Sequence, residues 1–334
     1  MSDLDLVRLH EYLAAHVPIA GELRAELIAG GRSNLTYRVS DGRSDWVLRR
    51  PPLGNLTPSA HDMEREYRVV AALADSAVPV ARAVAYCADP AVIGAPFAVV
   101  EHVGGRVIRT RDDLAGLTDA DVHRCAFALV DVLVDLHAVD PEAAGLGTFG
   151  RPDGYLGRQV RRWYDQWTRV ATRELPDLET LHDRLVEGCP DDSGSAIVHG
   201  DLRVDNAILD AGDVGTVRAL VDWEMSTLGD PLADLALHVV YRDPAFDPVL
   251  GGTGAASSDR MPSPDQLIER YVTRSGRDSG SLAFVLGLGY FKSAVIAEGI
   301  HQRFAAGHTV GTGFETVGGA VPQLAAAGLA ALAG

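Results

Sequence analysis

The hydrophobic and polar positions in the first hundred residues predict a part of the chain that is rich in strands. Residues 45–49 form a short apolar run that follows an Asp41-Gly42 turn and stops before Pro51-Pro52, which predicts a strand. Residues 60–73 place apolar side chains at helical spacing and predict a helix. Residues 96–100 are apolar and predict a further strand.

The pattern becomes mainly helical further along the chain. Residues 119–137 place leucines and alanines on one stripe and predict a helix, and residues 155–173 predict a second, arginine-rich helix. A strand–loop–strand unit over residues 196–221 interrupts the helices. The stretch 242–264 is rich in Gly, Ser and Pro and predicts a mobile loop, while the Ala- and Gly-rich tail after Gly307 is weakly specified.

The strand-rich first part of the chain and the helical second part predict an α+β protein with two lobes. At 334 residues the chain is long for a single hydrophobic core. We expect a small, strand-rich N-terminal lobe over residues 1–103, containing a sheet and one long helix. A larger helical C-terminal lobe is expected over residues 104–334.

The charge balance argues against two classes of partner. The chain has 46 acidic and 30 basic residues and a formal net charge of −16, which disfavours binding to nucleic acid or to an anionic membrane. All the basic residues but one are arginine, and the exception is Lys292. A P-loop requires a Gly-Lys pair, and Lys292 follows Phe291, so the sequence contains no P-loop.

Three features of the sequence predict a cytoplasmic location. The acidic start, Met1-Ser2-Asp3-Leu4-Asp5, lacks the basic residues of a signal peptide. The longest apolar run, near residues 282–291, is too short to span a bilayer. Cys87, Cys125 and Cys189 form no CxxC pair and are typical of thiols in a reducing cytosol.

One segment carries the residues that phosphoryl transfer requires. Two apolar residues lead into His199-Gly200-Asp201, and Asn206 follows five positions after the aspartate. Transfer to a hydroxyl needs a carboxylate that accepts the hydroxyl proton and oxygen ligands for magnesium beside the phosphate. Sixteen residues after Asn206, a second apolar run delivers Asp222. We expect Asp201 to be the catalytic base and Asn206 and Asp222 to be metal ligands.

The order of these motifs resembles that of the aminoglycoside phosphotransferase and choline kinase superfamily. After His-Gly-Asp, four residues and Asn come Val221-Asp222-Trp223-Glu224 and Gly229-Asp230-Pro231-Leu232-Ala233-Asp234. Further stretches are most similar to the kinase-like domain fused to some acyl-CoA dehydrogenases: Gly30-Gly31-Arg32-Ser33-Asn34, Trp46-Val47-Leu48-Arg49-Arg50-Pro51-Pro52, Arg65-Glu66-Tyr67-Arg68 and Gly150-Arg151-Pro152-Asp153-Gly154-Tyr155. The resemblance covers residues 25–240 and implies a protein-kinase-like fold with ATP and magnesium as cofactors.

The resemblance also implies roles for residues outside the loop of Asp201. Ser33 and Asn34 match the loop that covers the phosphates. Glu66 matches the helix acid that pairs with a cation on the neighbouring strand. Glu101 and Val103 match the hinge at which backbone groups meet adenine.

Three more polar residues are expected to support the structure without reacting. Asp234 matches a residue that braces the catalytic loop. His199 is expected to brace the same loop by hydrogen bonding, without an acid–base role. His137 follows a leucine stripe and is expected in the core or at a cap.

Arg49 stands at the strand position that lysine usually holds. An arginine can still pair with the helix acid and contact a phosphate oxygen, although it is bulkier and always charged. Arg50 takes this role if the strand register differs by one residue. The arginine also leaves open a catalytically silent pseudokinase, against which the intact Asp201, Asn206 and Asp222 argue.

The acceptor is expected to be a small molecule with a hydroxyl group, and the charge pattern favours an anionic or acyl-CoA-like one. The stretch 306–334 offers a single acidic side chain, Glu315, for a polycationic aminoglycoside. Residues 151–173 hold six arginines against two acids, Asp153 and Asp165, which suits phosphate or carboxylate recognition. An antibiotic phosphotransferase is the alternative, in which case these arginines are solvated or pair with acids elsewhere.

Overall fold

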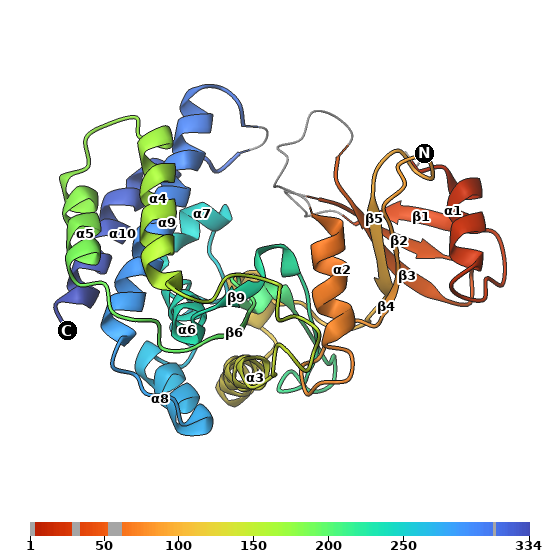
Figure 1. Cartoon of the computed structure of the whole chain (residues 1–334), viewed down its shortest axis with the longest axis horizontal. Helices are drawn as coiled ribbons and strands as arrows, with labels where there is room; N and C mark the ends of the chain where they lie inside the picture. Colours follow the sequence, from red (N-terminus) through yellow and green to blue (C-terminus); the bar gives the residue numbers. More distant parts are fainter. Residues whose placement is uncertain (1–3, 29–33, 53–61, 310–311) are drawn as a thin grey trace. The chain divides into compact units, whose positions relative to one another are not determined.

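The computed structural model describes residues 4–28, 34–52, 62–309 and 312–334, which form two compact units (Figure 1). Unit 1 consists of Met1–Gly105 and Arg218–Ser226, and unit 2 consists of Arg106–Val217 and Thr227–Gly334. Asp222 therefore belongs to the same unit as the first hundred residues, whereas Asp201 and Asn206 belong to unit 2.

Unit 1 is built on a five-stranded sheet with the strand order β1-β2-β3-β5-β4, in which every neighbouring pair is antiparallel. Its first segment contains α1 (Leu6–Ala14), β1 (Arg24–Leu27), β2 (Leu35–Ser40), β3 (Asp45–Arg50), α2 (Met63–Ala72), β4 (Ala83–Cys87) and β5 (Phe97–Glu101). Its second segment contains most of β8 (Val217–Leu220) and a 3-10 helix (Trp223–Met225). The predicted strands and helix of this region are confirmed, with ends that differ by at most three residues.

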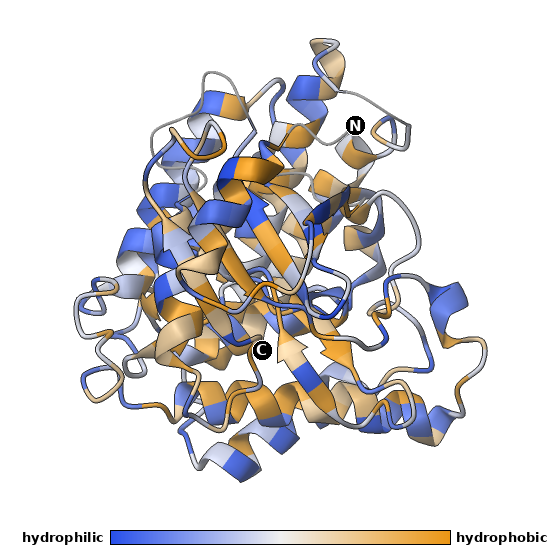
Figure 2. Ribbon diagram, turned by 90° about the vertical axis from the view of Figure 1, so that its right-hand side faces the viewer, coloured by the Kyte–Doolittle hydropathy of each residue, from blue (hydrophilic) through white to orange (hydrophobic). Residues whose placement is uncertain are grey.

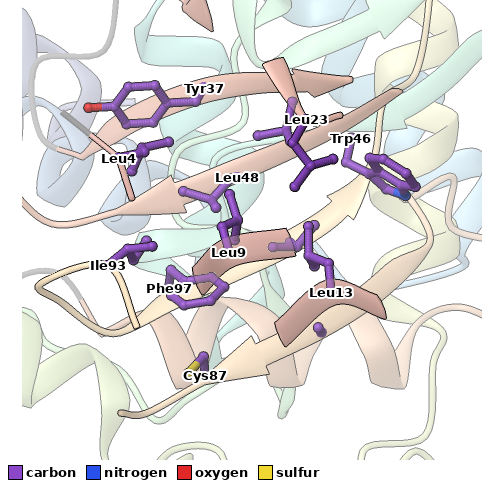
Figure 3. Close-up of a cluster of buried hydrophobic side chains, with 13 residues drawn as sticks. Leu4, Leu9, Leu13, Leu23, Tyr37, Trp46, Leu48, Cys87, Ile93 and Phe97 are labelled. Carbon is purple, nitrogen blue, oxygen red and sulfur yellow. The ribbon is translucent and has the colours of Figure 1, made fainter. Parts of the chain in front are cut away.

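The two faces of this sheet have different neighbours. On one face, Leu9 and Leu13 of α1 pack with Leu48 and Phe97 in a buried hydrophobic cluster (Figure 3). The helix α2 packs against β4 and β5. Burial alternates along β3, as a strand with a period of two residues requires, and Figure 2 shows hydrophilic residues between the hydrophobic ones along these strands.

Unit 2 is mainly helical. Its helices are α3 (Asp119–His137), α4 (Tyr155–Val170), α5 (Pro176–Glu187), α6 (Pro231–Val240), α7 (Asp247–Leu250), α8 (Pro264–Ser275), α9 (Leu282–Ala305) and α10 (Val317–Leu332). Its short strands are β6 (Ala196–Val198), β7 (Ala207–Leu209) and β9 (Thr227–Gly229), and 3-10 helices occur at Arg111–Leu114, Val204–Asn206 and Pro244–Phe246. The predicted helix over residues 119–137 is confirmed at both ends.

The apolar run near residues 282–291 is longer than the sequence suggested. It belongs to α9, a 24-residue helix that is long and apolar enough to cross a membrane by length and composition alone. However, 67% of its most apolar window is buried inside the protein, where α9 packs against α4, α6 and α10. The prediction that this run is too short to span a bilayer is therefore wrong as regards length, and burial among other helices gives its apolar character a structural explanation.

Two segments that the sequence left without regular structure contain helices. The tail forms α10, which buries Val317, Val321 and Leu324. The predicted loop 242–264 contains α7 and a 3-10 helix. Its remainder is tied to the Arg242 side chain, which donates to the carbonyl oxygens of Ala256, Ser258 and Met261. Small residues weaken the periodic signal, so packing partners determine these elements.

Candidate active site

The loop that contains Asp201 is fixed by a buried carboxylate. It leaves the buried strand β6, which pairs with β9. The two oxygens of Asp234 accept hydrogen bonds from the backbone N–H groups of His199, at 2.7 Å, and Gly200, at 2.8 Å. Burial opposes the charged form of Asp234, but the hydrogen bond and charge of His137 lower the pKa of this carboxyl below its usual value. The prediction that Asp234 braces the loop is confirmed.

The structure also shows the contacts of His199 and His137, the two histidines that were predicted to be structural. The Nδ1 atom of His199 accepts a 3.3 Å hydrogen bond from the backbone N–H of Asp201, which confirms that this side chain braces the loop. His137 is buried between the hydroxyl of Tyr271, at 2.7 Å, and Asp234, at 3.2 Å. It is therefore a core histidine that supports the carboxylate beneath the loop.

The helix α6 holds this loop through one of its faces. Asp234, His238 and Tyr241 follow one another at intervals of four and three residues, which places them on the same side of a helix. The imidazole of His238 donates to the carbonyl oxygen of Leu202 at 2.9 Å, and burial lowers its pKa below the usual value. The hydroxyl of Tyr241, at the C-terminal cap of the helix, donates a 2.6 Å hydrogen bond to Asp201 Oδ1.

Asp201 is therefore oriented on both of its oxygens. Tyr241 donates to Oδ1, and Asn206 Nδ2 donates to Oδ2 at 3.1 Å. Asn206 Nδ2 also donates to the Asp201 carbonyl oxygen at 2.8 Å, which closes the loop back on itself. Since the amide nitrogen serves both bonds, the amide oxygen Oδ1 is the atom of Asn206 available to a cation. Arg203 lies nearby, with Nη2 at 3.8 Å from Asp201 Oδ2.

In unit 1, Arg49 joins two carboxylates that the sequence assigned to the nucleotide site. Its Nη1 lies 3.0 Å from Glu66 Oε2 on α2, and its Nη2 lies 3.0 Å from Asp222 Oδ1. Arg50 is fully buried and its Nη2 donates to the Tyr37 hydroxyl at 3.3 Å. The strand register thus directs Arg49, and not Arg50, towards Glu66.

The buried carboxyl of Glu66 has a shifted pKa. Burial raises the pKa of its carboxyl from 4.5 to about 7, although the Arg49 charge opposes the shift. Its Oε1 accepts a 3.1 Å hydrogen bond from the side-chain amide of the buried Asn34. Asn34 and Glu66, which the resemblance assigned to different elements of one site, are therefore in direct contact.

The backbone of Asp222 has an unusual conformation. Its φ of 68° and ψ of 60° lie in the left-handed region, and among the described residues it is the sole non-glycine residue with positive φ. Such conformations cost free energy and cluster at functional sites. The 3-10 helix that follows is held by Trp223, whose indole N–H donates to the Leu220 carbonyl oxygen at 3.1 Å.

The remaining predicted site residues are Ser33, Glu101 and Val103. Ser33 lies outside the described residues. The backbone N–H of Glu101 donates to the Arg82 carbonyl oxygen at 2.8 Å, so it is not available to adenine. Within the described ranges no hydrogen bond involves Val103, whose backbone groups remain the candidates for that contact.

Each unit contains one of the two predicted magnesium ligands, Asp222 in unit 1 and Asn206 in unit 2. Asp222 and Asn206 offer a carboxylate and an amide oxygen, which are the hard ligands that magnesium prefers. In the part of the chain that the structure describes, no cluster of three or more His, Cys, Asp or Glu side chains is arranged to hold a metal. Magnesium in such sites is usually held by one or two protein oxygens together with substrate phosphates.

Sequence reasoning missed Tyr241 and His238. Their signal was present in the polar side chains at positions 234, 238 and 241 of an otherwise apolar helix. It was overlooked because the catalytic motif ends at Asn206. It also missed Lys292, whose Nζ donates to the Gly200 carbonyl oxygen at 3.2 Å from α9.

Comparison with known proteins places this geometry in a family. The model of the phosphotransferase enzyme family matches residues 24–268. The chain is 34% identical over 313 residues to Acyl-CoA dehydrogenase family member 11 of Homo sapiens, covering 91% of this chain and 40% of that protein. It is 37% identical over 298 residues to the Gallus gallus protein of the same name, covering 86% and 38% respectively. The chain thus spans about 40% of the length of these curated relatives.

Solved structures show the same architecture. The crystal structure of a provisionally assigned aminoglycoside phosphotransferase from Ralstonia eutropha JMP134 matches with a TM-score of 0.86 and 31% identity, covering 99% of this chain and 98% of that one. A thermostable mutant of aminoglycoside phosphotransferase APH(4)-Ia, solved with ADP and hygromycin B, matches with a TM-score of 0.63 and 14% identity, covering 97% and 98%. These matches confirm both the resemblance inferred from the motifs and the kinase-like α+β fold.

Proposed function

The chain belongs to the phosphotransferase enzyme family, and from this premise we propose that it is an ATP-dependent kinase that phosphorylates a hydroxyl group of a small molecule. The observation that carries the proposal is the arrangement of Asp201 and Asn206 on one braced loop. A catalytic carboxylate with fixed orientation and an adjacent metal ligand are what phosphoryl transfer to a hydroxyl requires. A relative of the same fold that was solved with ADP supports a nucleotide as the donor.

Each residue has a defined task in this mechanism. Asp201 accepts the proton of the attacking hydroxyl, and since each of its oxygens accepts one hydrogen bond here, a lone pair remains on each. Asn206 Oδ1 and the Asp222 carboxylate would hold magnesium, which when bound supplies positive charge to the phosphate oxygens. Arg49 contacts a phosphate oxygen while Glu66 fixes its guanidinium.

The base assignment is tested by changing one side chain. Asp201→Asn should lower turnover by at least ~10²-fold and leave ATP affinity nearly unchanged, because the amide preserves the shape but accepts no proton. Asp191→Asn, an exposed aspartate in the same unit, is the matched control and should have wild-type turnover. Near-normal turnover in Asp201→Asn would assign the base elsewhere. Nucleotide binding without turnover of any acceptor would instead support the pseudokinase.

For the acceptor, an anionic or acyl-CoA-like hydroxyl compound is the proposed class. Of the arginines in and beside α4, Arg173 pairs with Glu298 at 3.0 Å, and Arg158 donates to backbone carbonyl oxygens of Asp153 and Arg151. The other four form no salt bridge with the described residues; they are Arg151, Arg161, Arg162 and Arg169. This part of unit 2 therefore keeps positive charge that a polycation would meet unfavourably.

ATP consumption across a panel of acceptors tests this preference. The panel contains kanamycin-like aminoglycosides, choline-like amines and hydroxyacyl-CoA thioesters. Turnover of an anionic or thioester compound is expected. Efficient phosphorylation of the aminoglycosides, with no turnover of any hydroxyacyl-CoA, would assign the chain to the antibiotic phosphotransferases and leave the kinase activity in place.

A further inference from the structure

A pocket in unit 2 lies directly beside the loop of Asp201. It is formed by α4, α6 and α9, and α9 packs against both other helices. The residues that line it and carry polar or aromatic groups are Tyr155, Gln159, Trp163, Asp234 and Lys292, together with the backbone of Gly200. Figure 1 shows α4, α6 and α9 side by side in this unit. Gly200, which lines the pocket, directly precedes the predicted base Asp201 in the chain.

Lys292 brings a largely buried charge to the wall of the pocket. Its Nζ donates to the Gly200 carbonyl oxygen at 3.2 Å and lies 5.5 Å from the centre of the Trp163 ring. An ammonium has three donors, and this carbonyl accepts one. Among the described residues no carboxylate lies within salt-bridge distance of Nζ, and Lys292 is one of the residues that line the pocket. A buried charge in this situation is costly unless a partner is supplied.

The nearby charges explain why the chain itself does not supply that partner. Burial lowers the pKa of the Lys292 ammonium, while the charges of Asp201 and Asp234 oppose the shift. Both oxygens of Asp234 are already used by backbone N–H groups, and Asp201 is oriented by Tyr241 and Asn206. The chain therefore holds the ammonium near two carboxylates without pairing it with either.

Lys292 is also unusual in the composition of the chain. All the other basic residues of the chain are arginines, so arginine is its ordinary cation. A lysine differs from arginine by offering a compact point charge with rotatable donors in place of a planar fork. The one lysine has its ammonium against the Gly200 carbonyl oxygen and near the Trp163 ring. The guanidinium of Arg162 lies 5.9 Å from the same ring, which adds a second positive charge beside Trp163.

We propose that this pocket binds an oxyanion of the acceptor, a carboxylate or a phosphate, against the ammonium of Lys292 and beside the Trp163 ring. The part of the proposal that calls the ligand a phosphoryl acceptor rests on the proposed function. The oxyanion supplies the partner that the ammonium lacks, and the apolar remainder of the pocket receives the carbon skeleton. Binding here directs a hydroxyl of the same molecule towards Asp201.

The sole lysine allows a selective chemical test without ATP or turnover. The protein has two kinds of primary amine, Lys292 and the α-amino group, and each forms an imine with an aldehyde, with loss of water, that cyanoborohydride reduces to a secondary amine. Glyoxylate carries a carboxylate beside its aldehyde, and glycolaldehyde of the same carbon number carries none. Mass spectrometry of the peptides gives both labelling rates, and the α-amino group is the internal reference.

We expect the preference for glyoxylate over glycolaldehyde to be at least about tenfold greater at Lys292 than at the α-amino group, equivalent to about 1.4 kcal/mol. Inorganic phosphate should slow labelling at Lys292, whereas kanamycin should not. Lys292→Arg should remove this label and identify the peptide. Arg162→Gln should reduce the preference, and Arg24→Gln, an exposed arginine of unit 1, should not.

Two results would overturn the proposal. Equal preferences at both amines, without protection by phosphate, would show that the pocket does not recognise an anion. Labelling at the α-amino group alone would show that Lys292 only ties α9 to the loop and does not face a ligand. Neither result bears on phosphoryl transfer, which the Asp201→Asn comparison tests separately.

Discussion

Arg49 Nη2 lies 3.0 Å from Asp222 Oδ1, although 173 residues separate them in the chain. The same guanidinium holds Glu66 through its other nitrogen. The carboxylate predicted to bind magnesium is therefore paired with the cation predicted to contact phosphate. A magnesium ion bound by Asp222 would have to share this carboxylate with Arg49 or replace the arginine.

Asp222 should make ATP binding depend on magnesium. Asp222→Ala should weaken ATP binding in the presence of magnesium by at least about tenfold, because one of the metal's protein ligands is lost. Calorimetry with and without magnesium measures this effect. Asp75→Ala, an exposed carboxylate of the same unit, is the control. ATP affinity that is the same with and without the metal, and in wild type and Asp222→Ala, would remove the metal assignment.

The neighbouring arginines on β3 should give different kinds of defect. Arg49→Ala should raise the KM for ATP and lower turnover, with Arg49→Lys milder, because the phosphate contact and the pair with Glu66 are lost. Arg50→Ala should instead lower the free energy of unfolding, by about 1–3 kcal/mol, because it empties a buried site and leaves the Tyr37 hydroxyl unpaired. Steady-state kinetics and urea unfolding separate the two. A kinetic defect in Arg50→Ala with silent Arg49→Ala would contradict the register.

Glu66 should make stability depend on pH between about 4.5 and 7. Burial raises its pKa to about 7 in the folded chain, so the folded state holds a proton that the unfolded state has released. This contribution is fully present below pH 4.5 and is lost as the pH rises towards 7. Relative to Glu66→Gln, the wild-type free energy of unfolding should fall across this range by up to about 3 kcal/mol.

Urea unfolding at a series of pH values, without nucleotide or magnesium, measures this difference. Glu64→Gln, on the exposed side of the same helix, is the control and should follow the wild type. Parallel curves for wild type and Glu66→Gln would show that the buried carboxylate does not titrate in this range.

Tyr241 should affect turnover more than nucleotide binding. Tyr241→Phe removes the hydroxyl that donates to Asp201 Oδ1 and should lower kcat by about three- to tenfold, with little change in the KM for ATP. Tyr290→Phe is a matched control, since its hydroxyl bonds to Asp243 Oδ2 at 3.1 Å. Equal kinetics in both variants would mean that the Tyr241 bond serves structure alone.

The sequence by itself determined the elements whose signals are local. The leucine stripe of residues 119–137 predicted α3 to the residue, because side chains three and four positions apart share a helix face. The spacing from His199 to Asn206 predicted the loop that α6 braces. In a loop this short the chain turns back on itself, so Asn206 reaches the carbonyl oxygen of Asp201. Their order along the chain was sufficient to indicate the family.

Only the tertiary structure decided contacts between distant segments. Arg49 and Arg50 are adjacent in a sequence that gives both the same chemistry, and the sheet face on which each lies assigns one to Glu66 and the other to Tyr37. Lys292 joins Gly200 across 92 residues, and α10 packs against α9. Local periodicity carries no information on such contacts, since they form only when packing brings remote faces together.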